Sequence, residues 1–231
     1  MIALCYNSRR MDLGDCGTGS GGFKKGNTCA GGGEERQPQY IKDQIKRQQE
    51  LVSNLEKKLK EPSPIEKLYA VSGNGTVILS KQGDRTMVVI DPDDAKKMQE
   101  DGNTIVTHNH PQETSLSYPD IVFASKVNLK EVRAVAGAKT YIAKRPKEGW
   151  PDADKIIDRH DTINKRLFTM LKPRLDKEVK SLNENWEKLP IEKRNYSTLK
   201  NIYTKYTKFH SEALSSYVLK RLGVPYSIEV K

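Results

Sequence analysis

The chain lacks features that several large classes of protein require. Only three of its 231 residues are cysteine, and an odd number argues against a disulfide framework. No apolar run approaches the ~20 residues that a membrane-spanning helix needs. The apolar start at Met1–Tyr6 is too short for the core of a secretion signal. We therefore expect a protein of the cytoplasm that crosses no membrane.

Aromatic residues are also scarce, whereas charged residues are abundant. Aromatic side chains make up 7% of the chain and charged ones 30%, and lysine and arginine give a formal net charge of +10. A chain of this length is sufficient for one moderate domain with appendages. The composition therefore predicts a basic protein with one compact domain and water-exposed flanking parts.

Histidine is scarce as well, and two of the four histidines lie in one short stretch. The β-branched run Thr104–Thr107 predicts a short buried strand that leads into them. His108 and His110 are two positions apart, so both imidazoles leave the same face of a strand. Pro111 then denies the next backbone donor and takes the chain out of the sheet. Two imidazoles are therefore expected together at a strand end.

A predicted helix start supplies a third ligand. Ser117 is its expected N-cap and Pro119 lies in its first turn, which places Asp120 in that turn facing the histidines. Two imidazoles and one carboxylate are the ligand set of a catalytic zinc with one open position. The alternative is a surface histidine pair with Asp120 as a helix cap alone. His160 and His210 are expected to be ordinary surface or half-buried residues.

The motif His-Asn-His-Pro followed by Ser-x-x-Asp resembles that of the JAMM (JAB/MPN-type) zinc metallopeptidases. It is most similar to the RadC-like branch and to a related domain of phage head-morphogenesis proteins. The resemblance covers residues 64–146. It implies that Zn²⁺ is bound by His108, His110 and Asp120, and that Ser117 helps to stabilise the oxyanion. It also implies a general base at the start of the first strand, a place that Glu66 matches.

Two points remain open beside this resemblance. Six residues separate His110 from Ser117, one fewer than is usual in the family, although the phage variant is similarly short. A glutamate that opens a strand is ordinarily just solvent-exposed. The alternatives to Glu66 as the base are Asp84, Glu100 and Glu113, the last of which lies in the metal loop itself.

The resemblance implies a zinc-dependent hydrolase that cleaves a peptide or isopeptide bond in a peptide or protein substrate. It also implies a phage or prophage association, and hence a location in the bacterial cytoplasm or in the phage particle. The alternative is a non-proteolytic phage structural or effector module. Its metal site would then be structural or would act on nucleic acid.

The N-terminal part is predicted to contain a leader and a helix. Residues 1–34 are too rich in glycine to bury apolar area and are expected to be disordered. Cys16 and Cys29 lie there without a close third ligand, which is weak evidence for a metal site. Residues 39–61 are predicted to form an amphipathic helix. It either packs one stripe on the core or contacts a protein partner through residues 39–60.

The central part, residues 64–146, is predicted to be an α+β domain. We expect a small mixed sheet with flanking helices, as in JAMM and cytidine-deaminase folds. Turn residues and β-branched runs predict the elements. The expected strands are Glu66–Val71, Thr76–Ser80, Arg85–Ile90, the run into Thr107, Glu131–Ala136 and Thr140–Ala143, with helices that begin after Asp91 and at Pro119.

Residues 151–231 are predicted to form a helical region with a terminal strand at 224–230. A first long helix carries an apolar stripe that includes Met170, and Pro173 is expected to kink or break it. A second spans Ser197–Leu222, with Phe209 and Tyr217 in its stripe. Basic, tyrosine-bearing helices could contact nucleic acid, although acidic residues are mixed among the basic ones.

Overall fold

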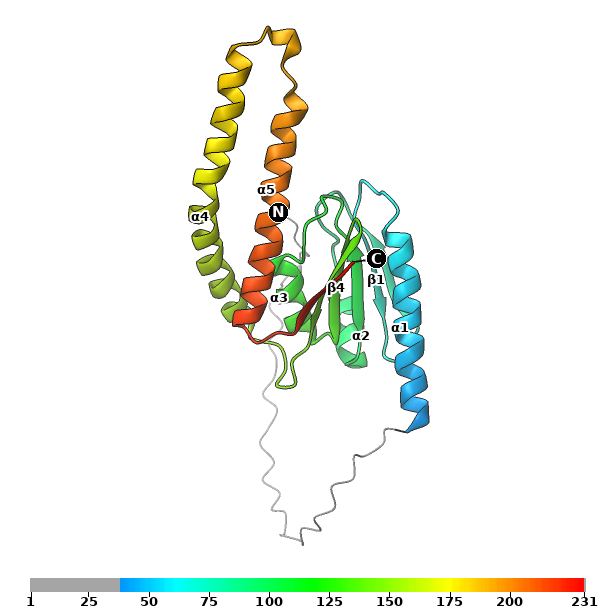
Figure 1. The fold of residues 1–231 in the computed structure, drawn as a ribbon. Coiled ribbons are helices and arrows are strands. Elements are labelled where there is room, and N and C mark those ends of the chain that lie inside the picture. Colours follow the sequence, from blue (N-terminus) through cyan, green and yellow to red (C-terminus); the bar gives the residue numbers. More distant parts are fainter. Residues whose placement is uncertain (1–37, 231) are drawn as a thin grey trace.

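The computed structural model of the chain describes residues 38–230. It confirms the predicted α+β class, with one mixed sheet flanked by helices (Figure 1). The predicted leader at 1–34, with Cys16 and Cys29, lies outside the described residues. Within 38–230, no helix is long and apolar enough to cross a membrane.

The sheet has six strands in the order β2-β1-β3-β4-β5-β6. Strands β3 and β4 are parallel and are joined by a crossover through α3, as parallel neighbours require, and the other described pairs are antiparallel. The strands are β1 Lys67–Val71, β2 Val77–Gln82, β3 Ile105–Asn109, β4 Glu131–Ala136, β5 Lys139–Lys144 and β6 Tyr226–Val230.

The predicted strand Arg85–Ile90 is wrong. Within this segment only Ile90 forms an isolated bridge, and the chain instead turns, with the Asp84 N–H donating to the Met87 carbonyl at 3.0 Å. Val88 and Ile90 are buried in the core whereas Val89 is 54% exposed. The alternation that resembles a strand therefore comes from loop residues packing on the core.

One face of the sheet is covered by α1 (Gln39–Leu59), in place of the helix predicted at 39–61. Its Val52 and Leu55 pack on Val71 and Ile105 of the sheet. The apolar stripe of this helix is therefore used within the chain. A partner contact through residues 39–60 remains a prediction.

The opposite face holds the main core. It is covered by α2 (Pro92–Asp101), by α3 (Tyr118–Val127), and by the sheet-proximal ends of α4 and α5. Asp91 caps α2 as predicted, by accepting the Asp94 N–H at 3.1 Å. Gly102 ends that helix with a φ of 67°, a left-handed conformation that glycine adopts without strain.

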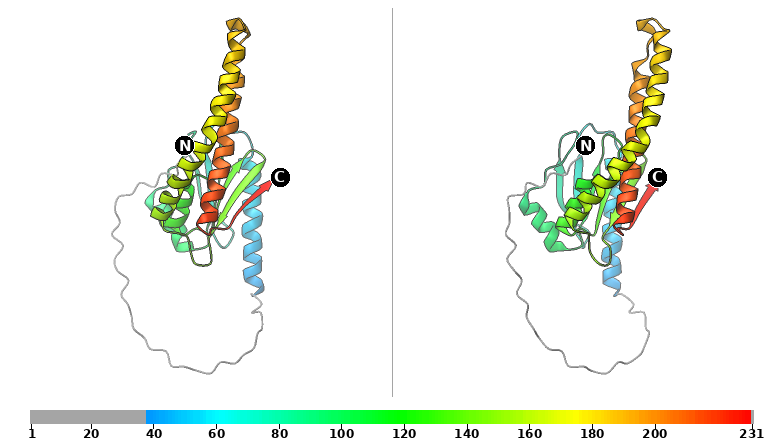
Figure 2. Two further views of the ribbon diagram at one scale, coloured as in Figure 1. Left: turned by 60° about the vertical axis from the view of Figure 1, so that its left-hand side comes forward. Right: turned by 90° about the vertical axis from the view of Figure 1, so that its left-hand side faces the viewer.

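Helices α4 (Ala153–Glu187) and α5 (Tyr196–Arg221) form a long hairpin inserted between β5 and β6. It projects well beyond the sheet as a slender arm, with a short 3₁₀ turn near its tip (Figures 1 and 2). Helix α4 continues through Pro173, so of the two predicted outcomes, a kink or a break, the break does not occur. The last strand, β6, returns to pair with β5, so the helical region also completes the sheet.

The apolar stripe predicted for α5 is partly wrong. Phe209 and Tyr217 are 59% and 54% exposed, and Met170 of α4 is also largely exposed. Helix α5 instead turns Ser215 and Val218 toward the domain. The reason is that only one side of the sheet-proximal part of α5 meets the core, so Tyr217, which lies between Ser215 and Val218 in the chain, remains exposed.

Candidate metal centre

The ends of β3 and α3 bring three ligands together. His108 and His110 leave the same face of β3, and their Nε2 atoms lie 2.8 Å apart. The Asp120 Oδ1 atom is 3.5 Å from His108 Nε2, and its Oδ2 atom is 3.6 Å from His110 Nε2. All three side chains are buried, which excludes a surface histidine pair. They form a group that could hold a metal ion.

The first turn of α3 orients the carboxylate. The Ser117 N–H donates to Asp120 Oδ2 at 2.7 Å, and the Asp120 N–H donates back to the Ser117 hydroxyl at 3.4 Å. This capping box fixes Ser117 as the N-cap. The buried Oδ1 atom has no hydrogen bond from any residue in 38–230. Asp120 can therefore cap the helix and bind a metal at the same time, because Oδ2 accepts the Ser117 N–H and Oδ1 is left for the metal.

A carbonyl in the following loop orients His110. The ring donates from Nδ1 to the Thr114 carbonyl at 2.9 Å, which leaves the Nε2 lone pair directed at the ligand group. Helix α5 holds this loop in place. The Ser115 N–H donates to the Ser211 hydroxyl at 3.1 Å, and the Ser215 hydroxyl donates to the Leu116 carbonyl. Ser211 and Ser215 of α5, which are distant in the chain, thus help to hold the loop that orients His110.

Burial and mutual charge set the protonation of the three ligands. Burial opposes a charged His108, but the neighbouring Asp120 carboxylate outweighs it and raises the pKa of that histidine. Burial likewise opposes a charged Asp120, but His108 and His110 hold its pKa below the usual range. Burial and the charge of His108 lower the pKa of His110 to about 4. A metal ion therefore competes with a proton for His108.

Glu66 lies next to this group, one residue before β1. Leu68 pairs with His108 across β1 and β3, so Glu66 leaves the same sheet face as His108 and His110. Its side chain is 0% exposed, and neither carboxylate oxygen has a hydrogen-bond partner among the described residues. Burial, opposed by His108 and reinforced by Asp120, raises the pKa of Glu66 to about 7. An unpaired buried carboxyl is costly and is typical of functional sites.

Asn109 holds the backbone on both sides of Glu66. Its side-chain oxygen accepts the Lys67 N–H at 2.6 Å, and its amide group donates to the Ile65 carbonyl at 3.1 Å. Sequence reasoning missed this residue. The available signal is a polar side chain between two histidines at the end of an otherwise apolar strand.

The competing acids are engaged elsewhere. Glu113 is exposed and pairs with Lys208 of α5. Glu100 is exposed and lies 3.8 Å from Lys96. The Asp84 carboxylate accepts the Thr86 N–H at 2.6 Å. None of these three contacts is with the ligand group, whereas Glu66 shares its face of the sheet.

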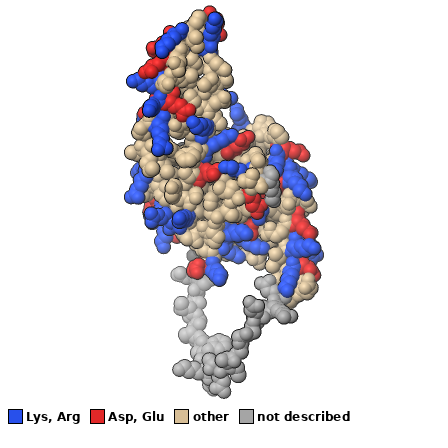
Figure 3. Space-filling view, viewed as in Figure 1, with Lys and Arg blue, Asp and Glu red and all other residues tan. Residues whose placement is uncertain are grey.

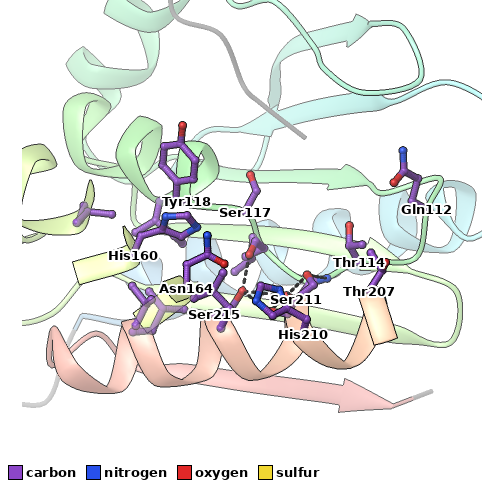
Figure 4. Close-up of a pocket in the computed structure, with 17 residues that line it drawn as sticks. Gln112, Thr114, Ser117, Tyr118, His160, Asn164, Thr207, His210, Ser211 and Ser215 are labelled. Atoms are coloured by element: carbon purple, nitrogen blue, oxygen red, sulfur yellow. Dashed lines mark hydrogen bonds between the residues drawn. The ribbon is translucent and has the colours of Figure 1, made fainter. Parts of the chain in front are cut away.

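A cavity of ≈260 Å³ lies beside the metal loop, which is defined here as residues 111–117 (Figure 4). Loop residues form one wall, and α3, α4 and α5 form the others. Ser117 lines this cavity while its backbone holds Asp120. His160 and His210 are half-buried, as expected, and also line it. Sequence reasoning did not predict this cavity.

Comparisons with protein-family models, with curated proteins and with solved structures gave no match. The function is therefore inferred from the residues themselves and from their arrangement.

Proposed function

We propose that this protein is a zinc-dependent hydrolase of JAMM type that cleaves a peptide or isopeptide bond. We further propose a phage or prophage association, with action in the bacterial cytoplasm or in the phage particle. One observation carries the proposal. A buried carboxylate without a hydrogen-bond partner in residues 38–230, Glu66, shares a sheet face with the convergent ligands His108, His110 and Asp120.

The donor set supports zinc as the metal. Two imidazole nitrogens and one carboxylate oxygen, with a fourth position open, are the ligands of catalytic zinc sites. Tetrahedral zinc with bonds near 2.0–2.1 Å separates its ligand atoms by about 3.3 Å. The two Nε2 atoms are 2.8 Å apart and Asp120 Oδ1 is 3.5 Å from His108 Nε2, which are distances around that value. One ligand atom from each of the three residues can be chosen so that all lie within 4.8 Å of one another. Small side-chain adjustments would accommodate the ion.

The proposed mechanism assigns one role to each group. His108, His110 and Asp120 would hold zinc, which lowers the pKa of a bound water to ~7 and polarises the substrate carbonyl. Glu66 accepts a proton from the attacking water and returns it to the leaving amine. Burial raises the pKa of Glu66, to about 7 in the metal-free protein, which favours a carboxyl group that can both accept and return a proton.

Ser117 is proposed to stabilise negative charge on the carbonyl oxygen under attack. Its hydroxyl oxygen accepts the Asp120 N–H within the capping box. A hydroxyl has one proton to donate in addition to its acceptor sites. Ser117 can therefore keep its capping bond and donate to the substrate oxygen at the same time.

The decisive experiment compares Glu66→Gln with Glu113→Gln in the zinc-loaded full chain. The probes are fluorescein-labelled casein, a library of internally quenched peptides and a lysine-linked isopeptide. On the probe that wild type cleaves, Glu66→Gln should retain zinc and lose about 10²- to 10⁴-fold in rate, because the water loses its proton acceptor. The exposed Glu113→Gln should behave as wild type.

Equal rates for Glu66→Gln and wild type would exclude Glu66 as the base. A wild type that holds zinc but cleaves none of the three probes would favour the structural or effector alternative.

A further inference from the structure

We propose that the cavity beside the metal loop is a specificity pocket for one apolar side chain of the substrate. The enzyme would then select an apolar residue beside the bond that it cleaves. This selectivity rests on the function proposed above and adds a substrate class to it.

The position of the cavity links it to the reacting centre. The metal loop contacts both, because its Thr114 carbonyl orients His110 and its residues 114–117 line the cavity. Ser117 also belongs to both, because its backbone N–H donates to Asp120 and the residue is part of the cavity lining. A substrate carbonyl bound at Ser117 would therefore have a neighbouring side chain close to the residues that line the cavity.

The size and lining of the cavity suit one apolar side chain. Its volume of ≈260 Å³ lies just below the ~300 Å³ at which small-molecule pockets begin, which is too small for a folded partner. An unfilled apolar cavity loses packing contacts, so an apolar occupant would stabilise it. The apolar wall residues are Leu116, Ile121, Ile156, Leu214, Val218 and Leu219.

Polar groups of the hairpin offer a contact for the peptide backbone. His160 and Asn164 from α4 and His210 from α5 line the cavity. The His160 ring packs against the Tyr118 ring at a tilt of 40°, with 4.5 Å between ring centres. The buried Nε2 atom of His210 has no hydrogen-bond partner in the part of the chain that the structure describes. A substrate amide is the chemistry that would satisfy it.

The wall formed by α5 is held in a fixed position. Ser115 donates from its hydroxyl to the Ser211 carbonyl at 2.7 Å, and Ser215 bonds to Leu116. These bonds attach the helix directly to the metal loop. The pocket is therefore preorganised relative to the ligand group, as a specificity site requires.

The test uses three zinc-binding probes and the zinc-loaded full chain in isothermal titration. The probes are the hydroxamates of N-acetyl-glycine, N-acetyl-leucine and N-acetyl-aspartate, which share the chelating group and differ in the side chain. The leucine compound should bind about 10- to 100-fold more tightly than the glycine compound, because its side chain is buried in the cavity. The aspartate compound should bind no more tightly than the glycine compound.

Leu214→Trp should fill the cavity. The affinity of the leucine hydroxamate should then fall to that of the glycine compound, while the affinity of the glycine compound should stay unchanged. The control is Tyr217→Trp, an exposed position on the same helix that does not line the cavity, and it should keep the preference. Thr207 also lines the cavity but is exposed, so Thr207→Trp should block the cavity without altering the packed core. It should therefore abolish the preference for the leucine compound as Leu214→Trp does.

Two outcomes distinguish this inference from the proposed function. Equal binding of the glycine and leucine compounds to wild type, or a leucine preference that survives both cavity-filling variants, overturns the specificity pocket alone. Failure of even the glycine compound to bind zinc-loaded wild type overturns the proposed zinc site, and the pocket assignment with it.

Discussion

The two faces of the sheet each bury a cluster of charged side chains, and the clusters differ in how they are satisfied. Under α1, Arg133 donates to Glu56 and to Glu131, both at 2.9 Å. On the opposite face, His108, His110 and Asp120 converge beside the unpaired carboxylate of Glu66.

Strand position does not explain the difference, because the two clusters involve the neighbouring strands β4 and β3 of the same sheet. A buried ion pair with good hydrogen bonds holds structure together. A buried carboxylate without a partner instead costs stability, and a protein retains it where the carboxylate is needed for binding or reaction. The first cluster is therefore interpreted as structural and the second as functional.

The largest expected effect is on metal content. Wild type should bind about one zinc per chain. Asp120→Ala should lose it, because two imidazoles alone leave the cation under-coordinated, whereas Arg133→Met should keep it. Elemental analysis of the purified proteins checks both. Retention of zinc by Asp120→Ala would mean that the ligand set is wrong.

The next effect is on the free energy of unfolding, and here the Arg133 cluster, which should not matter for zinc content, should matter most. Arg133→Met removes the shared partner of two buried carboxylates and should lower the free energy of unfolding by about 3–5 kcal/mol. Lys46→Met removes an exposed lysine of α1 that pairs with Glu50, and should change it by less than about 1 kcal/mol. Urea unfolding of both variants measures the difference. Similar values for the two would contradict a structural role for the Arg133 cluster.

The metal-free protein should show the cost of burying Glu66. Its pKa of about 7 in the folded state lies above the ordinary 4.5, so the folded state favours the neutral form. Stability should therefore be lost as pH rises from about 4.5 to about 7, by up to about 3 kcal/mol. Glu66→Gln removes this contribution.

His110 acts in the opposite direction, because its pKa of about 4 lies below the usual value. It destabilises the folded state as pH falls from about 6.5 to about 4. The relevant quantity is therefore the difference between wild type and Glu66→Gln, measured by urea unfolding in a chelator across this pH range. A difference that does not vary with pH would show that Glu66 titrates normally.

The smallest effect is expected for Asn109→Ala. The variant loses two hydrogen bonds that hold the backbone around Glu66, at a cost of about 1–3 kcal/mol in stability. Zinc should remain bound while hydrolysis slows, because the base is displaced and the ligands are not. Asn54→Ala, at an exposed position of α1, is the control. An unchanged rate in Asn109→Ala would show that Glu66 is held by other contacts.

The ligand group could be predicted from the sequence because local geometry determines it. Strand alternation places His108 and His110 on one face, and the capping box places Asp120 in the first turn of α3. The support of the loop could not be predicted, since Ser115 and Ser211 are 96 residues apart in the chain. Only the folded hairpin brings them together.

The errors outside the site have a common physical cause. The buried and exposed alternation at 85–90 resembles a strand but reflects a loop packing on the core. Phe209 and Tyr217 have the spacing of a buried stripe, yet they lie on a side of α5 that stays exposed while Ser215 and Val218 face the domain. Periodicity reports where a side chain could be buried, and tertiary structure decides whether anything lies there.

The inserted hairpin has a mechanical consequence. Basic and acidic side chains are interspersed over the visible side of the arm, so its tip could be engaged by a surface of either sign (Figure 3). A force on the tip would be carried along the hairpin to the sheet-proximal part of α5, which contains Ser211 and Ser215. Those serines bond to Ser115 and Leu116, and the adjoining Thr114 carbonyl holds the His110 ring. A tilt of the arm would thus be transmitted to a ligand of the proposed metal.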